Sequence, residues 1–309
     1  MKIQTWLEKN TASLAGRTVV ITGATGGLGA AACRDVLALG GRLLLVNRSP
    51  EKTAALRRAL LTEFPQGSVD SLRADLTDIE DVKAVTAQLK QKPIDILLLN
   101  AGAYSIPRKT CTTGWDNVFQ TNFVSHYYMV RELLPLLSRR KGRIVAVGSI
   151  AHWYSKTDPA DIDFAHRSAA SLVYGNSKRY LMYALTELLQ KYPEVRFAIA
   201  HPGISFTNIT AHYPKLIFAV IKWPMKVIFM RPDKAVLSII QGMFDNVPPL
   251  HWIGPGFFHI WGLPRVRALN SADAAERARI FHTAEDIYQK LISESPSEST
   301  PANGPAARP

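Results

Sequence analysis

The sequence predicts an α/β fold with a doubly wound, mostly parallel sheet, and three features of the chain support it. Apolar runs of strand length alternate with amphipathic stretches of helix length. The runs "RLLLV" and "IDILLL" hardly alternate between apolar and polar residues, which is typical of strands buried on both faces. A glycine-rich stretch, "TGATGGLGAA", follows the first apolar run directly. Strands joined through helices form right-handed crossovers, so helices should cover both faces of the sheet.

The predicted elements follow one another in a regular order. Helical patterns lie near residues 27–39, 51–63, 78–90, 113–138, 171–191 and 272–292. Six apolar runs are the candidate strands: Thr18–Ile21, Arg42–Val46, Val69–Arg73, Ile94–Leu99, Arg143–Val147 and Val195–Ala200. One domain should therefore cover residues 16–292, after an N-terminal extension of residues 1–15. The Ser/Pro/Gly-rich tail, residues 293–309, is predicted to be disordered.

The composition limits the class of protein. With 309 residues, 47% hydrophobic and 20% charged, the chain resembles an ordinary globular protein. Its two cysteines, Cys33 and Cys111, have no close pairing, which argues against a disulfide framework or a zinc site, so no metal is expected. The segment "MKIQTWLEKNTASLAG" is typical neither of a signal peptide nor of a spanning helix. We therefore expect a cytoplasmic protein, with membrane association left open.

The net charge of +12 restricts the partners. The basic residues are scattered, and no compact Lys/Arg run stands beside aromatic residues, so the pattern does not favour nucleic acid as a partner. Anionic ligands and an anionic membrane surface are the remaining candidates. A basic but otherwise ordinary surface is the alternative to both.

The glycine-rich stretch predicts a dinucleotide site. In a doubly wound sheet, ligands bind outside the carboxyl ends of the strands. A glycine-rich turn there lets the backbone approach a pyrophosphate, while N–H groups at the helix start face the anion. Gly23 would allow the tight turn, Gly27 the close approach and Gly29 the packing of helix on strand. A plain strand-to-helix turn is the alternative. The expected dinucleotide contacts also include Thr22, Thr25 and Leu28.

The end of the second strand indicates which dinucleotide binds. NAD-binding chains usually place Asp or Glu there to hold the ribose 2′-hydroxyl. Here the strand ends "LLLVNRSPEK", with Asn47 and then Arg48. No carboxylate is present to repel a 2′-phosphate, and a guanidinium can bind it through two hydrogen bonds. The sequence therefore favours NADP(H) over NAD(H). The alternative is that Arg48 only opens the next helix at the surface.

The stretch "YGNSKRY" carries the first candidate for chemistry. Tyr174 and Lys178 lie at positions i and i+4, on one face of a helix. A nearby ammonium favours the phenolate and should lower the tyrosine pKa towards neutrality, as a general acid requires. Ser149, in "VAVGSIA", stands at the carboxyl end of the fifth strand, where its hydroxyl can hydrogen-bond a substrate oxygen. Alternatives are a surface Tyr–Lys pair and an ordinary polar loop residue.

Two further groups of residues are expected near the same carboxyl edge of the sheet. The fourth strand ends "LLLNAG", which places Asn100, Ala101 and Gly102 at the carboxyl edge. In the long helix that follows, "FQTNFVSH" supplies Asn122, an amide where a helix interior usually prefers better helix formers. A solvent-facing amide is the alternative for Asn122.

Together these motifs make the chain resemble the short-chain dehydrogenase/reductase family from residue 16 to about 250, nearest to its classical type. The matching motifs, in order, are "TGATGGLG", "ADL", "LNAG", the asparagine at position 122, "VGSIA", "YGNSK" and "HPGISFT". The resemblance implies a Rossmann-type sheet of seven strands, the seventh not placed by periodicity, and a catalytic tetrad of Asn122, Ser149, Tyr174 and Lys178. It also implies that Tyr174 and Lys178 contact the cofactor. Asp75 with Leu76 would lie near the adenine, and Thr207, after Pro202 and Gly203, near the nicotinamide amide.

A looser resemblance concerns the substrate. The pattern "SIAHW…DIDF…Y…SK" is similar to retinol dehydrogenases and related lipid-carbonyl reductases, and His152, Trp153 and Tyr154 could line a substrate mouth. The apolar segment 207–230 is interpreted as a substrate lid. Peripheral membrane contact through residues 213–230, or an oligomer interface, is the alternative for this segment.

These observations predict an NADPH-dependent oxidoreductase. It would transfer a hydride between nicotinamide and a hydrophobic aldehyde or ketone, or the corresponding alcohol. The alternatives are an NAD-dependent, sterol-like alcohol dehydrogenase and a non-catalytic dinucleotide-sensing protein on the same fold. The chain would be a monomer or a homodimer. In a dimer, the family resemblance suggests that helices 113–138 and 171–191 pair into a four-helix bundle.

Overall fold

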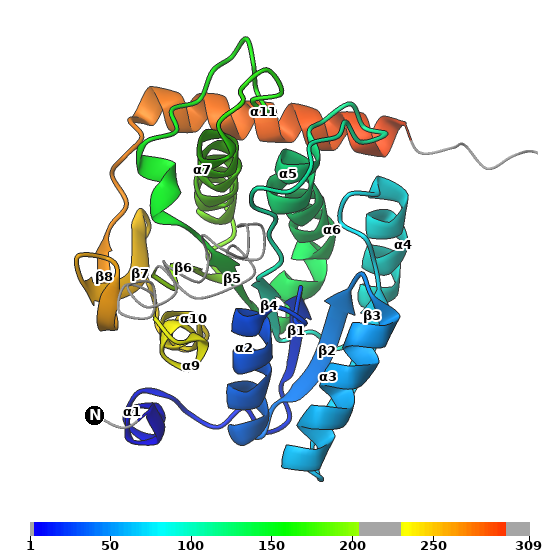
Figure 1. Cartoon of the computed structure of the whole chain (residues 1–309), viewed down its shortest axis with the longest axis vertical. Helices are drawn as coiled ribbons and strands as arrows, with labels where there is room; N and C mark the ends of the chain where they lie inside the picture. Colours follow the sequence, from blue (N-terminus) through cyan, green and yellow to red (C-terminus); the bar gives the residue numbers. More distant parts are fainter. Residues whose placement is uncertain (1–2, 204–229, 295–309) are drawn as a thin grey trace, which may run out of the picture.

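An eight-stranded sheet runs through the computed structural model, which describes residues 3–203 and 230–294 (Figure 1). The strand order is β3-β2-β1-β4-β5-β6-β7-β8, with β8 antiparallel to β7 and every other neighbouring pair parallel. This confirms the predicted doubly wound α/β class. The strands are β1 Thr18–Thr22, β2 Arg42–Asn47, β3 Ser68–Arg73, β4 Ile96–Leu99, β5 Arg143–Val147, β6 Arg196–Ala200, β7 His251–Phe257 and β8 Trp261–Ala268.

Helices cover both faces of this sheet, because neighbouring side chains of the buried strands point to opposite faces. Val20, Leu44 and Leu97 pack on the side of α4, α6, α7 and α11. Val19 and Leu43 pack on the side of α1, α2, α9 and α10. The helices are α1 Ile3–Asn10, α2 Gly27–Ala38, α3 Pro50–Glu63, α4 Ile79–Leu89, α5 Asn117–Phe119, α6 Ser125–Arg140, α7 Ala170–Leu189, α9 Pro232–Ala235, α10 Leu237–Gly242 and α11 Ala274–Ser293.

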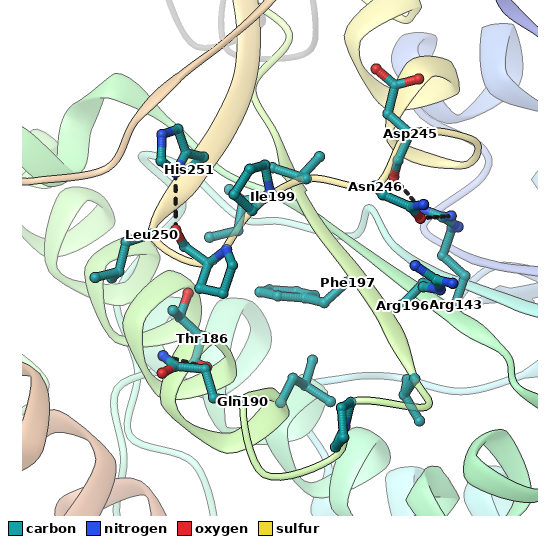
Figure 2. Close-up of a pocket in the computed structure, with 16 residues that line it drawn as sticks. Arg143, Thr186, Gln190, Arg196, Phe197, Ile199, Asp245, Asn246, Leu250 and His251 are labelled. Atoms are coloured by element: carbon teal, nitrogen blue, oxygen red, sulfur yellow. Dashed lines mark hydrogen bonds between the residues drawn. The ribbon is translucent and has the colours of Figure 1, made fainter.

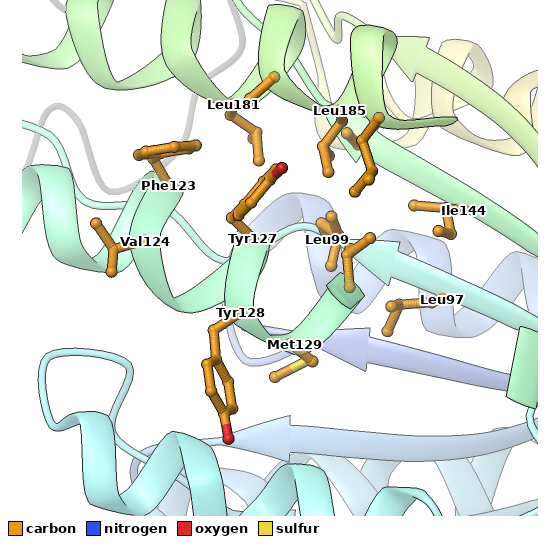
Figure 3. Packing of buried hydrophobic residues seen from close by; sticks show 14 of the residues in the cluster. Leu97, Leu99, Phe123, Val124, Tyr127, Tyr128, Met129, Ile144, Leu181 and Leu185 are labelled. Carbon is orange, nitrogen blue, oxygen red and sulfur yellow. The ribbon is translucent and has the colours of Figure 1, made fainter. Parts of the chain in front are cut away.

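The core below α6 and α7 supports the site from beneath. Figure 3 shows Tyr127 and Met129 of α6 and Leu181 and Leu185 of α7 in the same hydrophobic cluster as the β4 residue Leu97. All five side chains are buried. Close packing of this kind fixes the positions of the two helices relative to the strand ends.

Two differences from the sequence prediction have physical causes. The sheet has eight strands rather than seven, since β7 and β8 form a hairpin at its edge. The two strands were not predicted because their sequences, "HWIGPGF" and "WGLPRVRA", contain glycine and proline, which obscure the strand pattern. The single helix predicted over residues 113–138 is divided into α5, a π-helical turn η1 at Gln120–Val124, and α6.

The C-terminal helix lies across the helical layer. In Figure 1, α11 crosses above α7 and α6. Its buried residues Ile280, Ala284 and Tyr288 belong to the same hydrophobic cluster as α6 and α7. The helical face that the predicted four-helix bundle would use is therefore partly covered by this chain's own helix.

Several sequence predictions concern residues outside the described part of the chain. Thr207, nearly all of the expected lid at 207–230, and the tail from residue 295 onward lie there. Among the described helices, none is both long and apolar enough to cross a membrane.

Candidate active site

The candidate site residues converge at the carboxyl ends of three neighbouring strands. Thr22 ends β1, Asn100 follows β4, and Ser149 lies beyond the end of β5. These strands are adjacent in the order β1-β4-β5, so loops far apart in the sequence meet at one edge of the sheet. Tyr174 and Lys178, the catalytic candidates on α7, lie in the helical layer next to this edge. This edge is where doubly wound sheets bind their ligands.

The glycine turn has the geometry expected at Gly23 and Gly29. Gly23 has φ +66°, and a Cβ there would lie 2.7 Å from the Ala101 Cα. A Cβ on Gly29 would lie 2.7 Å from the Ala24 Cα, so this glycine allows helix α2 to pack on the turn. At Gly27, in the described chain, a Cβ would meet only Pro232, at 3.7 Å. The start of α2 is therefore accessible to an anionic ligand, as a pyrophosphate site requires.

A hydrogen-bond network joins this turn to the loop after β4. The Thr22 hydroxyl accepts bonds of 3.0 Å from the backbone N–H groups of Asn100 and Ala101. The Asn100 amide donates to the carbonyl oxygens of Thr22 and Gly23. The Nε2 atom of the buried His126 lies 3.0 Å from the same Thr22 hydroxyl. The floor of the expected dinucleotide site is thus a fixed arrangement.

Asn122 lies in the π-helical turn and faces inward. Its Oδ1 accepts from the Ala103 N–H at 2.7 Å, and its Nδ2 donates to the Ala103 carbonyl oxygen and the Ser177 hydroxyl. The side chain is fully buried, so the alternative of a solvent-facing amide is wrong. π-Helical turns within α-helices are frequent at functional sites.

Ser149, Tyr174 and Lys178 surround the space above the strand ends. The Ser149 hydroxyl lies close enough to the Tyr174 phenol to favour its ionised form, and it accepts from the Ala151 N–H at 3.2 Å. The Lys178 Nζ lies 5.9 Å from the centre of the Tyr174 ring and donates to the Val147 carbonyl oxygen at 2.8 Å. A Cβ on Gly102 would lie 3.6 Å from that Nζ and 3.5 Å from the Asn122 Oδ1, so Lys178 and Asn122 both approach the loop after β4 at Gly102.

The acidity of the pair differs from the sequence expectation. Burial raises the pKa of Tyr174 to about 12, and the neighbouring Ser149 hydroxyl only partly opposes it. Burial lowers the pKa of Lys178 to about 8. The predicted lowering of the tyrosine pKa by Lys178 is therefore wrong for this arrangement: the ammonium is turned towards Val147, and desolvation dominates.

The end of β2 tests whether the residues fit an adenosine 2′-phosphate. Asn47 is buried, yet neither its Oδ1 nor its Nδ2 has a hydrogen-bond partner in the described residues. Buried amides normally have partners, so this one is free to bind a ligand. The Arg48 guanidinium is largely exposed, 4.0 Å from the Asp75 carboxylate. A long, exposed ion pair of this kind is weak, and it leaves the cation available.

The remaining residues predicted to contact the cofactor differ in exposure and location. Thr25 is exposed at the glycine turn, whereas Leu28 is a buried residue of α2. Leu76 is also buried, and its carbonyl oxygen accepts from the Ser125 hydroxyl. Pro202 and Gly203 follow β6 at the same edge. Leu28 and Leu76 therefore offer only backbone to a ligand.

Sequence reasoning missed two polar groups of the site. His126 stands four residues after Asn122 in "NFVSH", and Ser177 stands within "YGNSK". His126 bonds the Thr22 hydroxyl, and Ser177 accepts from the Asn122 amide. The available signal was spacing: an i+4 residue shares a helix face with Asn122, and Ser177 directly precedes Lys178.

A separate cavity of about 400 Å³ lies at the opposite, amino-terminal edge of the sheet (Figure 2). Phe197, Ile199 and Leu250 form apolar walls, and Arg143 and Arg196 stand at one end. The Arg143 guanidinium already donates to the carbonyl oxygens of Gly242 and Phe244 at the end of α10. None of the tetrad candidates lines this cavity, so we place the chemistry at the carboxyl edge.

Comparison with known proteins agrees with this geometry. The family model described as short chain dehydrogenase matches residues 17–215. Retinol dehydrogenase 14 of Mus musculus is 30% identical over 228 residues, which cover 67% of this chain and 68% of that protein. Retinol dehydrogenase 14 of Homo sapiens is 29% identical over 231 residues, covering 67% of this chain and 69% of that protein. The chain thus spans about two thirds of the length of these relatives.

Solved structures show the same fold. A crystal structure of an uncharacterized protein from Mycobacterium paratuberculosis has a TM-score of 0.74 at 26% identity, covering 90% of this chain and 95% of that one. A short-chain dehydrogenase from Sphingobium yanoikuyae, solved in complex with NADPH, has a TM-score of 0.58 at 21% identity. That match covers 94% of this chain and 100% of the other. The chain belongs to the short-chain dehydrogenase family and is an oxidoreductase, with retinol dehydrogenases among its relatives.

Proposed function

We propose that this chain is an NADPH-dependent reductase of hydrophobic aldehydes and ketones. One observation carries the proposal: the neighbouring hydroxyls of Ser149 and Tyr174 stand beside the buried Lys178 at the strand edge that carries the glycine turn. A proton donor, an oxygen-orienting hydroxyl and a cation are thereby grouped next to an anion-accessible helix start.

The chemistry divides between the cofactor and the protein. A bound reduced nicotinamide dinucleotide supplies the hydride for the carbonyl carbon. Tyr174 gives its phenolic proton to the carbonyl oxygen, so the product is the alcohol. The raised tyrosine pKa keeps that proton on the phenol at neutral pH, and Ser149 orients the accepting oxygen. Lys178 would contact the cofactor, as the family resemblance implies, and the anchored Asn122 fixes the helix turn and the loop after β4.

The end of β2 supports NADP(H) as the cofactor. Asn47 and Arg48 offer an unpaired amide and an exposed guanidinium, and no carboxylate ends the strand to select a free 2′-hydroxyl. Arg48 would bind the 2′-phosphate and release its weak pairing with Asp75. Gly23, Gly27 and the start of α2 would hold the pyrophosphate.

Aromatic side chains around Tyr174 support an apolar substrate. The Tyr104 ring stands edge-on to the Tyr174 ring, 5.2 Å between centres. Trp153 and Tyr154 are 45% and 55% exposed just beyond Ser149. Such a mouth favours a lipophilic carbonyl over a sugar or a small polar ketone. We propose a monomer rather than a homodimer, because α11 partly covers the helical face expected to pair.

The proposal is tested by following the loss of NADPH absorbance against a panel of lipophilic and polar carbonyls, with NADH in parallel. Faster turnover with NADPH, confined to the apolar members, is expected. Faster turnover with NADH and oxidation of sterol-like alcohols would replace the proposal with the NAD-dependent alternative. Tight NADPH binding without turnover of any member would favour the dinucleotide-sensing alternative.

A further inference from the structure

The tip of the β7–β8 hairpin, residues 257–260, exposes two large aromatic side chains. Phe257 is 60% exposed and Phe258 is 73% exposed, and their rings stand 4.6 Å apart at the outer edge of the sheet. Leu263 and Val266 of β8 are 46% and 40% exposed. A cluster of exposed large apolar side chains on one element marks a contact surface rather than ordinary scatter.

The backbone of the tip is held in an unfavourable conformation. Phe258 and His259 both have positive φ, +49° and +58°, and the Ile260 N–H donates to the Phe257 carbonyl oxygen. Positive φ at both central residues is the pattern of a type I′ turn, which favours Asn and Gly rather than Phe and His. The fold therefore maintains an aromatic residue where it is costly, which points to a use for that residue.

The base of the tip is anchored from inside. The His259 ring stacks on the buried Trp252 at 5.4 Å between ring centres and meets the Trp153 ring at 4.9 Å. Its carbonyl oxygen accepts from His201 at 2.9 Å. Anchoring of His259 leaves the phenylalanine pair outside the core, so the tip is a rigid projection.

The charge of the hairpin selects among partners. From Asn246 to Ala272 the sequence contains Arg265 and Arg267 but no Asp or Glu. Arg265 is exposed on β8. An aromatic tip backed by cationic side chains matches the boundary of a bilayer with anionic headgroups, where aromatic rings enter the interface and arginines remain at the headgroups.

A second copy of this chain fits the hairpin less well. Pairing of two β8 edges would have to accommodate Pro264, which has no N–H to donate, and would bring Arg265 of each copy close together. Both features are ones by which proteins prevent edge-to-edge association.

We propose that Phe257 and Phe258 form a membrane-contact surface that docks this protein on bilayers containing anionic lipid. The tip lies beside the candidate active site: a Cβ on Gly203 would lie 2.6 Å from the Ile260 carbonyl oxygen, and Trp153, in the turn that begins at Ser149, contacts the His259 ring. Docking would therefore present the substrate mouth to molecules dissolved in the bilayer. This consequence rests on the proposed function, whereas the docking itself does not.

The test is flotation of the full chain with vesicles of phosphatidylcholine, with and without phosphatidylglycerol, at low salt. The native protein should float with the anionic vesicles. The double variant Phe257→Ser/Phe258→Ser should partition onto these vesicles at least about tenfold less, since each phenylalanine would bury apolar area in the bilayer interface. Ile292→Ser is the matched control, because Ile292 is an exposed apolar residue of α11. Unchanged thermal unfolding and NADPH affinity would show that the double variant is folded.

A labelled variant gives a second readout. Cys33 and Cys111 are buried, so Phe258→Cys can carry a polarity-sensitive fluorophore at the tip, with Ile292→Cys as its counterpart. A blue shift with anionic vesicles at position 258 alone is expected. Equal flotation of the native protein and the double variant, or no blue shift at the tip, would overturn the proposal. So would loss of a dimer, in place of loss of vesicle binding, in the double variant. Each result is obtained without turnover, so it leaves the proposed reductase activity untouched.

Discussion

His126 joins Thr22 to the helix turn of Asn122. Its Nε2 lies 3.0 Å from the Thr22 hydroxyl, and its Nδ1 lies 3.2 Å from the Asn122 carbonyl oxygen. The Asn122 carbonyl oxygen can only accept, so Nδ1–H donates to it and Nε2 of the neutral ring accepts from the Thr22 hydroxyl, whose other acceptor, the Leu98 carbonyl oxygen, lies farther away at 3.4 Å. Burial lowers the pKa of His126 to about 3, which keeps the ring neutral in this tautomer. The imidazole therefore couples the dinucleotide floor to a tetrad candidate.

Replacing His126 by phenylalanine should reduce kcat about tenfold and change the Kd for NADPH less than about threefold. The reason is that the glycine turn keeps its own backbone geometry, while the Asn122 turn loses a buried hydrogen bond of about 1–3 kcal/mol. Stopped-flow turnover and NADPH fluorescence separate the two quantities. Thr86→Val is the control, since it removes a buried hydroxyl that bonds the Val82 carbonyl oxygen on distant α4. Equal losses of kcat in both variants would contradict the coupling.

Tyr174→Phe should lower kcat by about 10³-fold or more while NADPH still binds, because only the acidic proton is removed. Tyr104→Phe is the matched control: it keeps the ring that stands against Tyr174 and removes a neighbouring hydroxyl. Its turnover should remain within about threefold of the native value. Substantial activity in Tyr174→Phe would rule out this tyrosine as the acid.

The fold was predictable where the pattern is local, as in β5, whose predicted bounds Arg143–Val147 equal the observed ones. Buried parallel strands show as uninterrupted apolar runs, and Ser49 and Asp78 cap the helices that follow β2 and β3. The hairpin β7–β8 was not predictable from periodicity, because Gly254 and Pro255 interrupt the apolar pattern of β7.

The site was predictable to the same extent. Spacing placed Tyr174 and Lys178 on one helix face, but it could not tell where the ammonium points. The carbonyl of Val147, on another element, binds it and leaves burial to decide the tyrosine pKa. The role of His126 was not predicted either, because its hydrogen-bond partner Thr22 stands 104 positions earlier in the sequence.

Arg48→Leu should raise the KM for NADPH about 10- to 100-fold and leave the KM for NADH nearly unchanged. The variant loses a charge-assisted, bidentate contact to the 2′-phosphate of NADPH. NADH has no 2′-phosphate, so its binding does not depend on this contact. Arg42→Leu is the control, since Arg42 is an exposed arginine at the opposite end of the same strand. Equal effects on both cofactors would contradict a 2′-phosphate role for Arg48.

The protein should lose stability steeply as the pH falls below 6.5. Burial lowers the pKa of His126 and His152 to about 3 and that of His201 to about 4, from 6.5. Between these values the unfolded chain binds protons that the folded chain does not, so the free energy of unfolding rises with pH and falls on acidification. Each histidine contributes about 1.4 kcal/mol per pH unit within its window.

Urea midpoints measured from pH 7 to pH 4 check this slope. His152→Gln should reduce it by about 1.4 kcal/mol per pH unit, because one group that titrates in this range is removed and the replacement stays neutral. His282→Gln serves as the control, since His282 is exposed on α11. A slope that is the same in the native protein and in His152→Gln would show that these histidines do not set the acid limit.

Glu276→Gln should destabilise the protein by about 3–5 kcal/mol, because it leaves a buried charge unpaired. Arg179 is fully buried in α7 and lies 2.6 Å from the Glu276 carboxylate at the start of α11. The same guanidinium donates to the His152 carbonyl oxygen in the turn after Ser149, so the ion pair ties α11 to the active-site loop. Glu187→Gln is the control: its pair with Arg277 is partly exposed on the same two helices and should cost less than about 1 kcal/mol. Urea unfolding measures both, and similar losses in the two variants would mean that burial of Arg179 does not determine the strength of this attachment.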